Sequence, residues 1–272
     1  LHKAIRRQRQ MCIRDRIRTL LNALDATGII CDDELSPVQM NHLQQELESK
    51  IMDRTLLILD IFASRAVTKE GKIQVELAQL RYRAVRLVGL GSSLSRLGGG
   101  IGTRGPGEKK LEMDRRLIKE RISQLKKELE HVKKHRELLR EGRKKDRVMT
   151  AAIVGYTNAG KSTILNRMVE QFGELPDKTV MEKDMLFATL ETSVRSVDTG
   201  HNKPFFLTDT VGFINKLPHG LVKAFRSTLE EVRYADLLIQ VVDFSDENYR
   251  QQMQVTADTL KELGAGDLSL IH

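Results

Sequence analysis

Two hydrophobic patterns divide the chain into an N-terminal and a C-terminal half. After residue 108, apolar side chains recur at steps of seven, four and three residues, which is the heptad spacing of a helix that buries one seam. The seam comprises Leu111, Ile118, Ile122, Leu125, Leu129, Val132 and Leu139. Residues 72–90 also repeat with a helical period. We therefore expect these two segments to form a long antiparallel helical hairpin.

The C-terminal half alternates short apolar runs with amphipathic segments of helical period. The expected strands are residues 151–154, 194–197, 205–207 and 237–242, and the expected helices are residues 162–172, 220–234 and 247–263. Strands that alternate with helices indicate an α/β domain with a doubly wound, mostly parallel sheet.

The first part of the chain contains shorter elements. Residues 17–24 predict a helix and residues 29–31 a strand, while Ser36 followed by Pro37 is typical of a helix start. Residues 52–62 mix strand and helix signals that periodicity does not separate.

The composition divides the chain into three parts, which are residues 1–16, 17–147 and 148–272. Residues 1–16 are basic and without a clear period, so we interpret them as a basic arm or a foreign leader, favour the leader, and assign them no function. Residues 142–147 are interpreted as a basic linker to the C-terminal α/β domain.

The stretch between the first expected strand and helix of the C-terminal domain fits the phosphate-binding P-loop pattern G-x-x-x-x-G-K-[ST]. It reads Gly155, Tyr156, Thr157, Asn158, Ala159, Gly160, Lys161, Ser162 and Thr163. Its glycines allow successive amides to face a phosphate at a positive helix N-terminus. Lys161 is predicted to reach the β- and γ-phosphates of a nucleotide, and Ser162 to bind Mg²⁺.

A second motif follows the expected strand at residues 205–207. It is D-x-x-G, formed by Asp209, Thr210, Val211 and Gly212, and at this distance from a P-loop it favours a GTPase. Asp209 is predicted to hold Mg²⁺ through water, and the Gly212 amide to contact the γ-phosphate.

Between the two motifs, Thr189 is the expected residue that closes over Mg²⁺, with Thr192 as a rival. We expect the stretch around it to contact the nucleotide as well, through Phe187, Ala188, Thr189, Leu190 and Glu191. Lys161, Thr189 and Gly212 are the residues to which we assign catalytic roles.

Phe213 stands where signalling GTPases place a glutamine that orients the attacking water. Phenylalanine forms no such hydrogen bond, so we expect slow hydrolysis that rises with a partner. Asn158 is a candidate ligand for a monovalent cation, which raises K⁺ stimulation as a second hypothesis.

The net charge of +8 is concentrated in two segments. Residues 108–147 hold 16 Lys and Arg against 9 Asp and Glu, and residues 1–16 hold 6 against 1. This distribution favours a polyanionic partner away from the nucleotide site, although a solvated helix face is the alternative.

A glycine-rich stretch at residues 97–107 precedes the basic helix and cannot be a regular element. On a helical hairpin it would form the tip, where amides and arginines suit phosphate contacts. The expected RNA-binding residues are Arg96, Gly99, Gly100, Arg104, Lys109 and Lys110. A flexible interdomain linker is the alternative interpretation.

Cys12 and Cys31 match no metal or redox spacing, so we expect two unpaired thiols. No apolar run approaches the roughly 18 residues of a membrane span. With no signal-peptide pattern either, the expected compartment is the cytoplasm, and the expected state is a monomer.

These motifs together resemble the HflX family of ribosome-associated GTPases. The resemblance rests on the P-loop, on residues 187–190 and 209–213, on Leu217-Pro218-His219, and on the glycine-rich stretch at 99–108. It implies an N-terminal α/β domain with a helical hairpin that docks on the large (50S) ribosomal subunit and reaches its RNA near the peptidyl-transferase centre. It also implies GTP hydrolysis with Mg²⁺ and a role in the splitting, rescue or biogenesis of ribosomes.

The chain departs from this family at its end. The guanine-reading N-K-x-D motif and the last sheet strand are expected just after residue 267 and are absent, as is any C-terminal domain. We interpret the chain as a fragment with non-native ends and expect an unpaired sheet edge with reduced stability. Guanine specificity then rests on the resemblance. A nucleotide-independent RNA- or ribosome-binding module and a P-loop ATPase are the alternatives.

Overall fold

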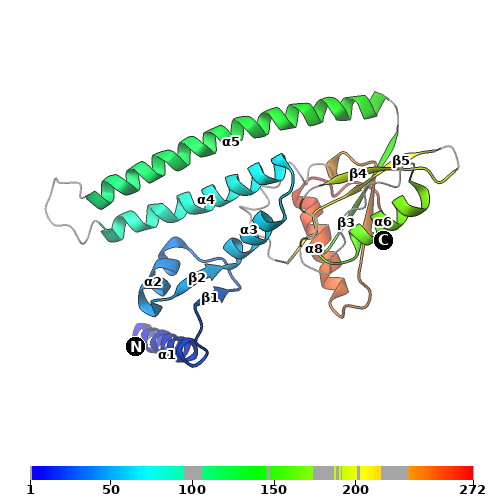
Figure 1. Ribbon diagram of the computed structural model, residues 1–272. Coiled ribbons are helices and arrows are strands. Elements are labelled where there is room, and N and C mark those ends of the chain that lie inside the picture. The colour runs from blue at the N-terminus through cyan, green and yellow to red at the C-terminus, as the bar shows by residue number, and fades with distance from the viewer. Residues whose placement is uncertain are drawn as a thin grey trace. The chain divides into compact units, whose positions relative to one another are not determined.

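The computed structural model describes residues 2–94, 106–145, 148–173, 187, 190, 192–200, 203–215 and 232–271 (Figure 1). The chain divides into two compact units. The first contains Leu1–Asp60 and Gln79–Arg121, and the second contains Ile61–Ala78 and Ile122–His272. Two long helices, α4 (Lys69–Leu94) and α5 (Pro106–Lys145), contribute to both units.

The first unit is built on two parallel strands, β1 (Gly28–Cys31) and β2 (Lys50–Asp53), joined by helix α2 (Pro37–Leu47). Helix α1 (His2–Ala23) precedes them. The core between these elements contains Met40, Leu47 and Ile51, against which Ile17, Leu21 and Ile29 pack. The helix and strand expected at residues 17–31 are therefore confirmed. Residues 2–16, for which the sequence predicts no element, form the first part of α1 and are continuous with its amphipathic part.

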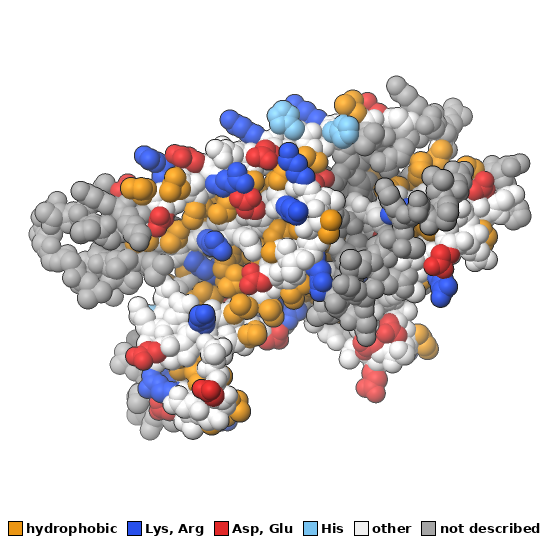
Figure 2. Space-filling model, viewed as in Figure 1, with side chains coloured by type: hydrophobic (Ala, Val, Ile, Leu, Met, Phe, Trp, Pro, Cys, Tyr) orange, Lys and Arg blue, Asp and Glu red, His pale blue; other side chains and the backbone are white. Residues whose placement is uncertain are grey.

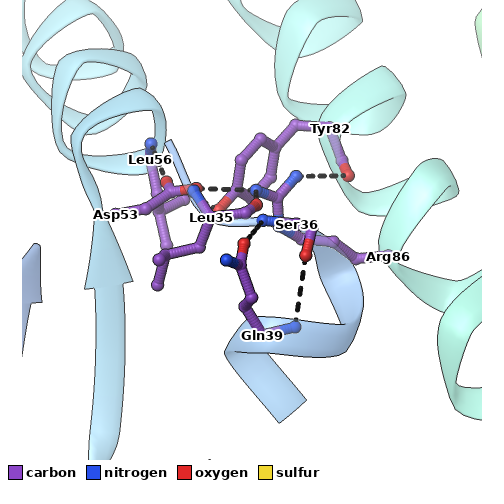
Figure 3. A network of polar contacts seen from close by, with 7 residues as sticks. All are labelled: Leu35, Ser36, Gln39, Asp53, Leu56, Tyr82 and Arg86. Carbon is purple, nitrogen blue, oxygen red and sulfur yellow. Dashed lines mark hydrogen bonds and ion pairs between the residues drawn. The ribbon is translucent and has the colours of Figure 1, made fainter. Parts of the chain in front are cut away.

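The start of α2 shows why Ser36 and Pro37 mark a helix boundary. The Ser36 hydroxyl accepts a hydrogen bond from the Gln39 amide, and the Gln39 side chain accepts one from the Ser36 amide (Figure 3). This reciprocal cap satisfies two donors that have no partner within the helix. The mixed signals at residues 52–62 are also explained, since β2 ends at Asp53 and α3 (Arg54–Arg65) begins at the next residue.

Asp53 joins three parts of the first unit through its buried carboxylate (Figure 3). It accepts hydrogen bonds from the Leu56 amide at 2.8 Å and the Leu35 amide at 3.2 Å. Arg86 forms an ion pair with it at 2.6 Å, and the Tyr82 hydroxyl donates to it at 2.8 Å, both from α4. Burial, together with this hydrogen bond, raises the pKa of Tyr82, so the phenol stays a donor at neutral pH. The network fastens α4 to the junction of β2 and α3.

We expect Tyr82→Phe to lower the free energy of unfolding by about 1.5 kcal/mol. This value is at the low end of the stabilisation given by a hydrogen bond to a charged group, because Asp53 would still interact with Arg86 and with two backbone amides in the variant. Tyr249→Phe serves as the matched control, because the Tyr249 hydroxyl makes only an exposed hydrogen bond, from Arg250, and it should change stability by less than about 0.5 kcal/mol. Urea denaturation of both variants measures the difference, and equal effects would contradict the account.

Helices α4 and α5 lie side by side and antiparallel (Figure 1). Within the first unit, Arg115 on α5 donates to the Leu87 carbonyl on α4 at 2.9 Å. In the second unit the α5 seam is buried at Leu125 and Leu129, which are 1% and 9% exposed. The expected hairpin is thus confirmed. The linker expected from residue 142 is wrong, because α5 continues through Gly142 to Lys145.

The second unit contains a five-stranded sheet in the order β4-β5-β3-β6-β7. Its strands are β3 (Met149–Gly155), β4 (Ser193–Val197), β5 (Phe205–Asp209), β6 (Leu237–Val241) and β7 (Leu270–Ile271). All neighbours are parallel except β4 and β5. This confirms the expected α/β fold with a mostly parallel sheet.

Helices α6 (Lys161–Phe172) and α8 (Tyr249–Glu262) pack on the sheet. One face buries Ile153, Leu165 and Leu207 in a common core. Ala152 and Val154, which point to the opposite face, are 0% exposed, so β3 is covered on both sides. A central strand with both faces covered provides a rigid base for the loop that follows it.

The expected unpaired edge at β6 is wrong in part, because β7 pairs with Leu238 and Ile239. The helix expected at 220–234 lies outside the described residues, apart from its end at Val232–Tyr234. Within the described part of the chain, no helix combines the length and apolar character needed to cross a membrane.

Candidate functional site: a nucleotide-binding loop

The P-loop occupies the turn between β3, which ends at Gly155, and α6, which begins at Lys161. Gly160 is the residue before the helix and has a left-handed backbone, with φ at 89°. The N-terminus of α6 therefore follows the end of β3 after a short loop, and a helix N-terminus favours an anion. Asn158 also has a left-handed backbone, with φ at 62°, and is exposed. Tyr156 and Ala159 are partly buried, and Thr163 is exposed.

Lys161 is held inside this turn. Its side chain is 6% exposed, and its Nζ donates to the Tyr156 carbonyl at 2.7 Å. Burial lowers the pKa of Lys161 from 10.5 to about 8, and the nearby Asp209 opposes that shift. An ammonium group has three N–H donors, so a Lys161 that donates to one carbonyl is suited to receive phosphate oxygens as well.

The low pKa of Lys161 predicts a pH dependence of nucleotide binding. A bound phosphate raises the pKa of a lysine, so binding above pH 8 must take up a proton. We expect a larger uptake of protons at pH 9 than at pH 7.5, because the empty site loses the lysine proton as the pH rises through about 8. Affinity should fall correspondingly as the pH rises through 8. Calorimetry of GDP binding in buffers of different ionisation enthalpy measures this uptake, and equal uptake at both pH values would contradict it.

Ser162 and Asp209 come together although they are 47 residues apart in sequence. The Ser162 hydroxyl donates to Asp209 Oδ2 at 2.7 Å, and Asp209 is 0% exposed at the end of β5. Hard oxygen ligands of this kind fit Mg²⁺, which usually takes one or two protein ligands together with phosphates and waters. Among the described residues no cluster of three or more His, Cys, Asp or Glu could hold a metal alone. The donor set thus fits a magnesium ion that is shared with a nucleotide.

The D-x-x-G stretch is fastened directly to the P-loop. Thr157 donates its amide to the Phe213 carbonyl at 2.7 Å, and Phe213 donates to the Gly155 carbonyl at 3.1 Å. Gly212 approaches so closely that an added Cβ would lie 2.6 Å from Thr157 Cα and 3.0 Å from Lys161 Nζ. The predicted γ-phosphate contact, Gly212, is therefore next to the lysine predicted to bind the same group.

The residues beside Gly212 are anchored in the core. The Thr210 hydroxyl donates to the Ile153 carbonyl at 2.6 Å, and Val211 is 6% exposed. Phe213 is 1% exposed and its side chain is fully packed. Asn215 donates its amide to the Tyr156 hydroxyl at 3.2 Å, which adds a further tie. These contacts hold the stretch in place, with Gly212 beside Lys161.

The stretch expected to contain the Mg²⁺-closing threonine is described only in part. Phe187 and Leu190 are both 3% exposed, and the Phe187 amide donates to the Thr157 hydroxyl at 2.9 Å. Ala188, Thr189 and Glu191 lie outside the described residues. The sequence did not reveal that the Thr157 side chain joins this stretch to the P-loop. A threonine at a variable position of the motif carries no signal of that role.

Most of the expected RNA-binding residues fall outside the part of the chain that the structure describes. Arg96, Gly99, Gly100 and Arg104 are outside the described residues, as are Leu217, Pro218 and His219. Lys109 and Lys110 belong to the first turns of α5, and their side chains are also outside the described part.

Three family models match successive stretches of the chain. Residues 12–63 match the family model of the GTP-binding GTPase N-terminal region, and residues 65–143 match that of the GTP-binding GTPase middle region. Residues 150–270, which include the P-loop, match the 50S ribosome-binding GTPase model.

The chain is also similar in sequence to individual proteins. GTPase HflX of Lacrimispora saccharolytica is 61% identical over 257 residues, which are 94% of this chain and 59% of that protein. GTPase HflX of Escherichia coli K12 is 47% identical over 252 residues, or 92% of this chain and 58% of that protein. The crystal structure of a GTP-binding protein from Sulfolobus solfataricus in complex with GDP is 28% identical, covers 92% of this chain and 64% of that one, and has a TM-score of 0.44.

The chain spans less than two thirds of the length of these curated relatives. Its matches nevertheless cover the N-terminal, middle and GTPase regions together, and the motifs at Lys161, Ser162 and Asp209 meet at one end of the sheet. The chain therefore belongs to the HflX family of GTPases.

Proposed function

We propose that this protein binds GTP with Mg²⁺ at the P-loop and hydrolyses it to GDP and phosphate. The observation that carries the proposal is the meeting of Lys161, Ser162 and Asp209 at one site, with Gly212 next to Lys161. Lys161 would bind the β- and γ-phosphates, and the Gly212 amide would contact the γ-phosphate. Ser162 and Asp209 would hold Mg²⁺, together with Thr189, and the ion would neutralise charge on the phosphate oxygens.

The buried side chain of Phe213 limits this chemistry. A phenyl ring can neither accept nor donate the hydrogen bond that would orient an attacking water. We therefore propose slow hydrolysis by the chain alone, and faster hydrolysis when a partner supplies the missing group. A bound K⁺ near Asn158 is a further candidate for part of that role.

Phosphate release should be measured with and without large ribosomal subunits, in K⁺ and in Na⁺. Equal rates with and without subunits would contradict the partner requirement, and equal rates in the two salts would exclude the K⁺ role.

We also propose that the protein associates with the large ribosomal subunit, as the 50S ribosome-binding GTPase model matched by residues 150–270 suggests, and that the hairpin of α4 and α5 makes the contact. Lysine and arginine side chains are spread over the hairpin face shown in Figure 2, among acidic and apolar ones. Exposed examples on α5 are Arg116, Lys119, Lys126 and Lys127. Some of this charge is balanced locally, as in the Arg116–Glu120 pair at 3.5 Å. The excess of basic residues suits phosphate contacts that position a protein on RNA.

Co-sedimentation with purified large subunits tests this association. We expect binding that is stronger with a non-hydrolysable GTP analogue than with GDP, and that weakens steeply with salt. Binding that ignores the nucleotide would favour a nucleotide-independent ribosome-binding module instead. Because the guanine-reading motif is not part of this chain, ATP should be included, and a preference for ATP would favour a P-loop ATPase. The family's role in splitting or rescuing ribosomes is tested separately by the sedimentation of whole ribosomes with and without the protein.

A further inference from the structure

Phe187 has a backbone conformation that needs external support. Its φ of 55° lies in the left-handed region, which bulky residues rarely adopt. Such strain persists only where the surroundings hold the residue in place. Two contacts do so here. The Phe187 amide donates to the Thr157 hydroxyl at 2.9 Å, and the Phe187 ring meets the Phe62 ring edge to face, with centroids 4.8 Å apart and an interplanar angle of 89°.

Phe62 belongs to the last turn of α3, far from the nucleotide motifs in sequence. Both rings are deeply buried, with Phe62 2% and Phe187 3% exposed, and both residues lie in the second unit. An edge-to-face pair at this distance is stabilising beyond the area it buries. The side chain of Phe62 therefore fixes the ring of Phe187, and through it the amide that binds Thr157.

Thr157 carries this contact into the phosphate site. Its amide donates to the Phe213 carbonyl at 2.7 Å, and Phe213 directly follows Gly212. A continuous series of contacts thus connects Phe62, Phe187, Thr157 and Phe213. It ends beside the backbone amide that would meet a γ-phosphate.

We propose that Phe62 is a positioning residue that sets the preference of the site for GTP over GDP. The inference rests on the proposed function. The amides at the start of α6, which are not part of this series of contacts, would hold the phosphates common to both nucleotides. The stretch around Gly212 would meet only the γ-phosphate. Fixing that stretch in advance lowers the ordering cost of GTP binding and leaves GDP binding unchanged.

The decisive variant is Phe62→Leu, which keeps an apolar side chain but removes the ring. We expect the affinity for a non-hydrolysable GTP analogue to fall roughly 2- to 12-fold, which corresponds to the strength of an aromatic pair, with GDP affinity unchanged. Phe172→Leu is the matched control. Phe172 ends α6 and packs on the sheet core, roughly 16 Å along the helix from Lys161. Removal of the Phe172 ring should lower the melting temperature. The ratio of the affinities for the GTP analogue and for GDP should stay as in the wild type.

A double-mutant cycle with Phe187→Leu separates a specific contact from general loosening. If the rings act together, the double variant should lose little more GTP-analogue affinity than Phe62→Leu alone. The reverse effect is measurable without any variant, because coupling is reciprocal. In the wild type, amides at Ile61–Arg65 should exchange more slowly with the GTP analogue than with GDP, and this result holds even if a variant fails to fold.

The outcomes distinguish this inference from the proposed function. A wild-type chain that binds neither nucleotide overturns both. A wild type that prefers the GTP analogue, together with a Phe62→Leu variant that keeps the same preference, overturns the inference alone. Equal losses for both nucleotides in Phe62→Leu would also overturn it, as would identical exchange at Ile61–Arg65 with the two nucleotides.

Discussion

Replacing Lys161 with methionine is expected to weaken binding of GTP by roughly 100-fold or more, and binding of GDP, which lacks the γ-phosphate, by less. Methionine has a similar length and keeps the apolar contacts, but it removes the ammonium group that would donate to two phosphates. Charge-assisted hydrogen bonds contribute about 1.5–3 kcal/mol each, and every 1.4 kcal/mol is a tenfold change in affinity. Titration with a fluorescent guanine nucleotide measures the loss.

The same substitution should not destabilise the empty protein. The pKa of Lys161 falls from 10.5 to about 8 on folding, so its charge opposes folding below pH 8. That penalty decreases as the pH rises from about 8 to 10.5, because the unfolded chain then binds more protons than the folded one. Lys161→Met should therefore melt at or above the wild-type temperature at pH 7. A variant with a lower melting temperature, or with nearly normal affinity, would contradict the role given to this lysine.

Gly155→Ala is expected to lower the free energy of unfolding of the second unit by about 3 kcal/mol or more. Gly155 has φ at 150°, and an added Cβ would lie 2.4 Å from the Val241 carbonyl oxygen on β6. The new methyl group must push the two central strands apart at the point where the P-loop begins. Nucleotide affinity should fall with stability, because the loop starts from the displaced strand.

Gly142→Ala is the matched control for this prediction. Gly142 lies in α5, and an added Cβ would meet nothing within 4 Å. Alanine is favoured over glycine in a helix, so this variant should be stabilised by up to about 1 kcal/mol. Thermal unfolding followed by circular dichroism compares the two. If Gly155→Ala melts like the wild type, the tight packing between β3 and β6 would be refuted.

The sequence predicted those features that depend on local pattern. The heptad seam of residues 111–139 and the strand-helix alternation after residue 148 both reflect burial of one face or of a whole strand. Such burial leaves a direct trace in the order of apolar residues. The pairing of Ser162 with Asp209 was also predictable, because each belongs to a motif with a known place at the end of a parallel strand.

Features that depend on contacts between distant residues were not predictable. Nothing local indicates that the Thr157 hydroxyl accepts the Phe187 amide, or that Phe62 meets Phe187, because any buried phenylalanine has the same pattern. The helix through Gly142 was missed because glycine and a run of basic residues resemble a linker. The helical start of α1 was missed because its residues follow no apolar period. In both cases, continuity with an adjacent amphipathic segment decided the structure.

Binding of labelled GTP with and without Mg²⁺ tests the central claim most directly. The chain should be titrated with fluorescent GTP, GDP and ATP, in Mg²⁺ and in EDTA, alongside Lys161→Met. We predict binding of GTP that is tightened by Mg²⁺, weaker binding of ATP, and loss of both in the variant. Binding of GTP that is equal in Mg²⁺ and EDTA and unchanged by Lys161→Met would show that the residues at the end of β3 and β5 do not form the nucleotide site.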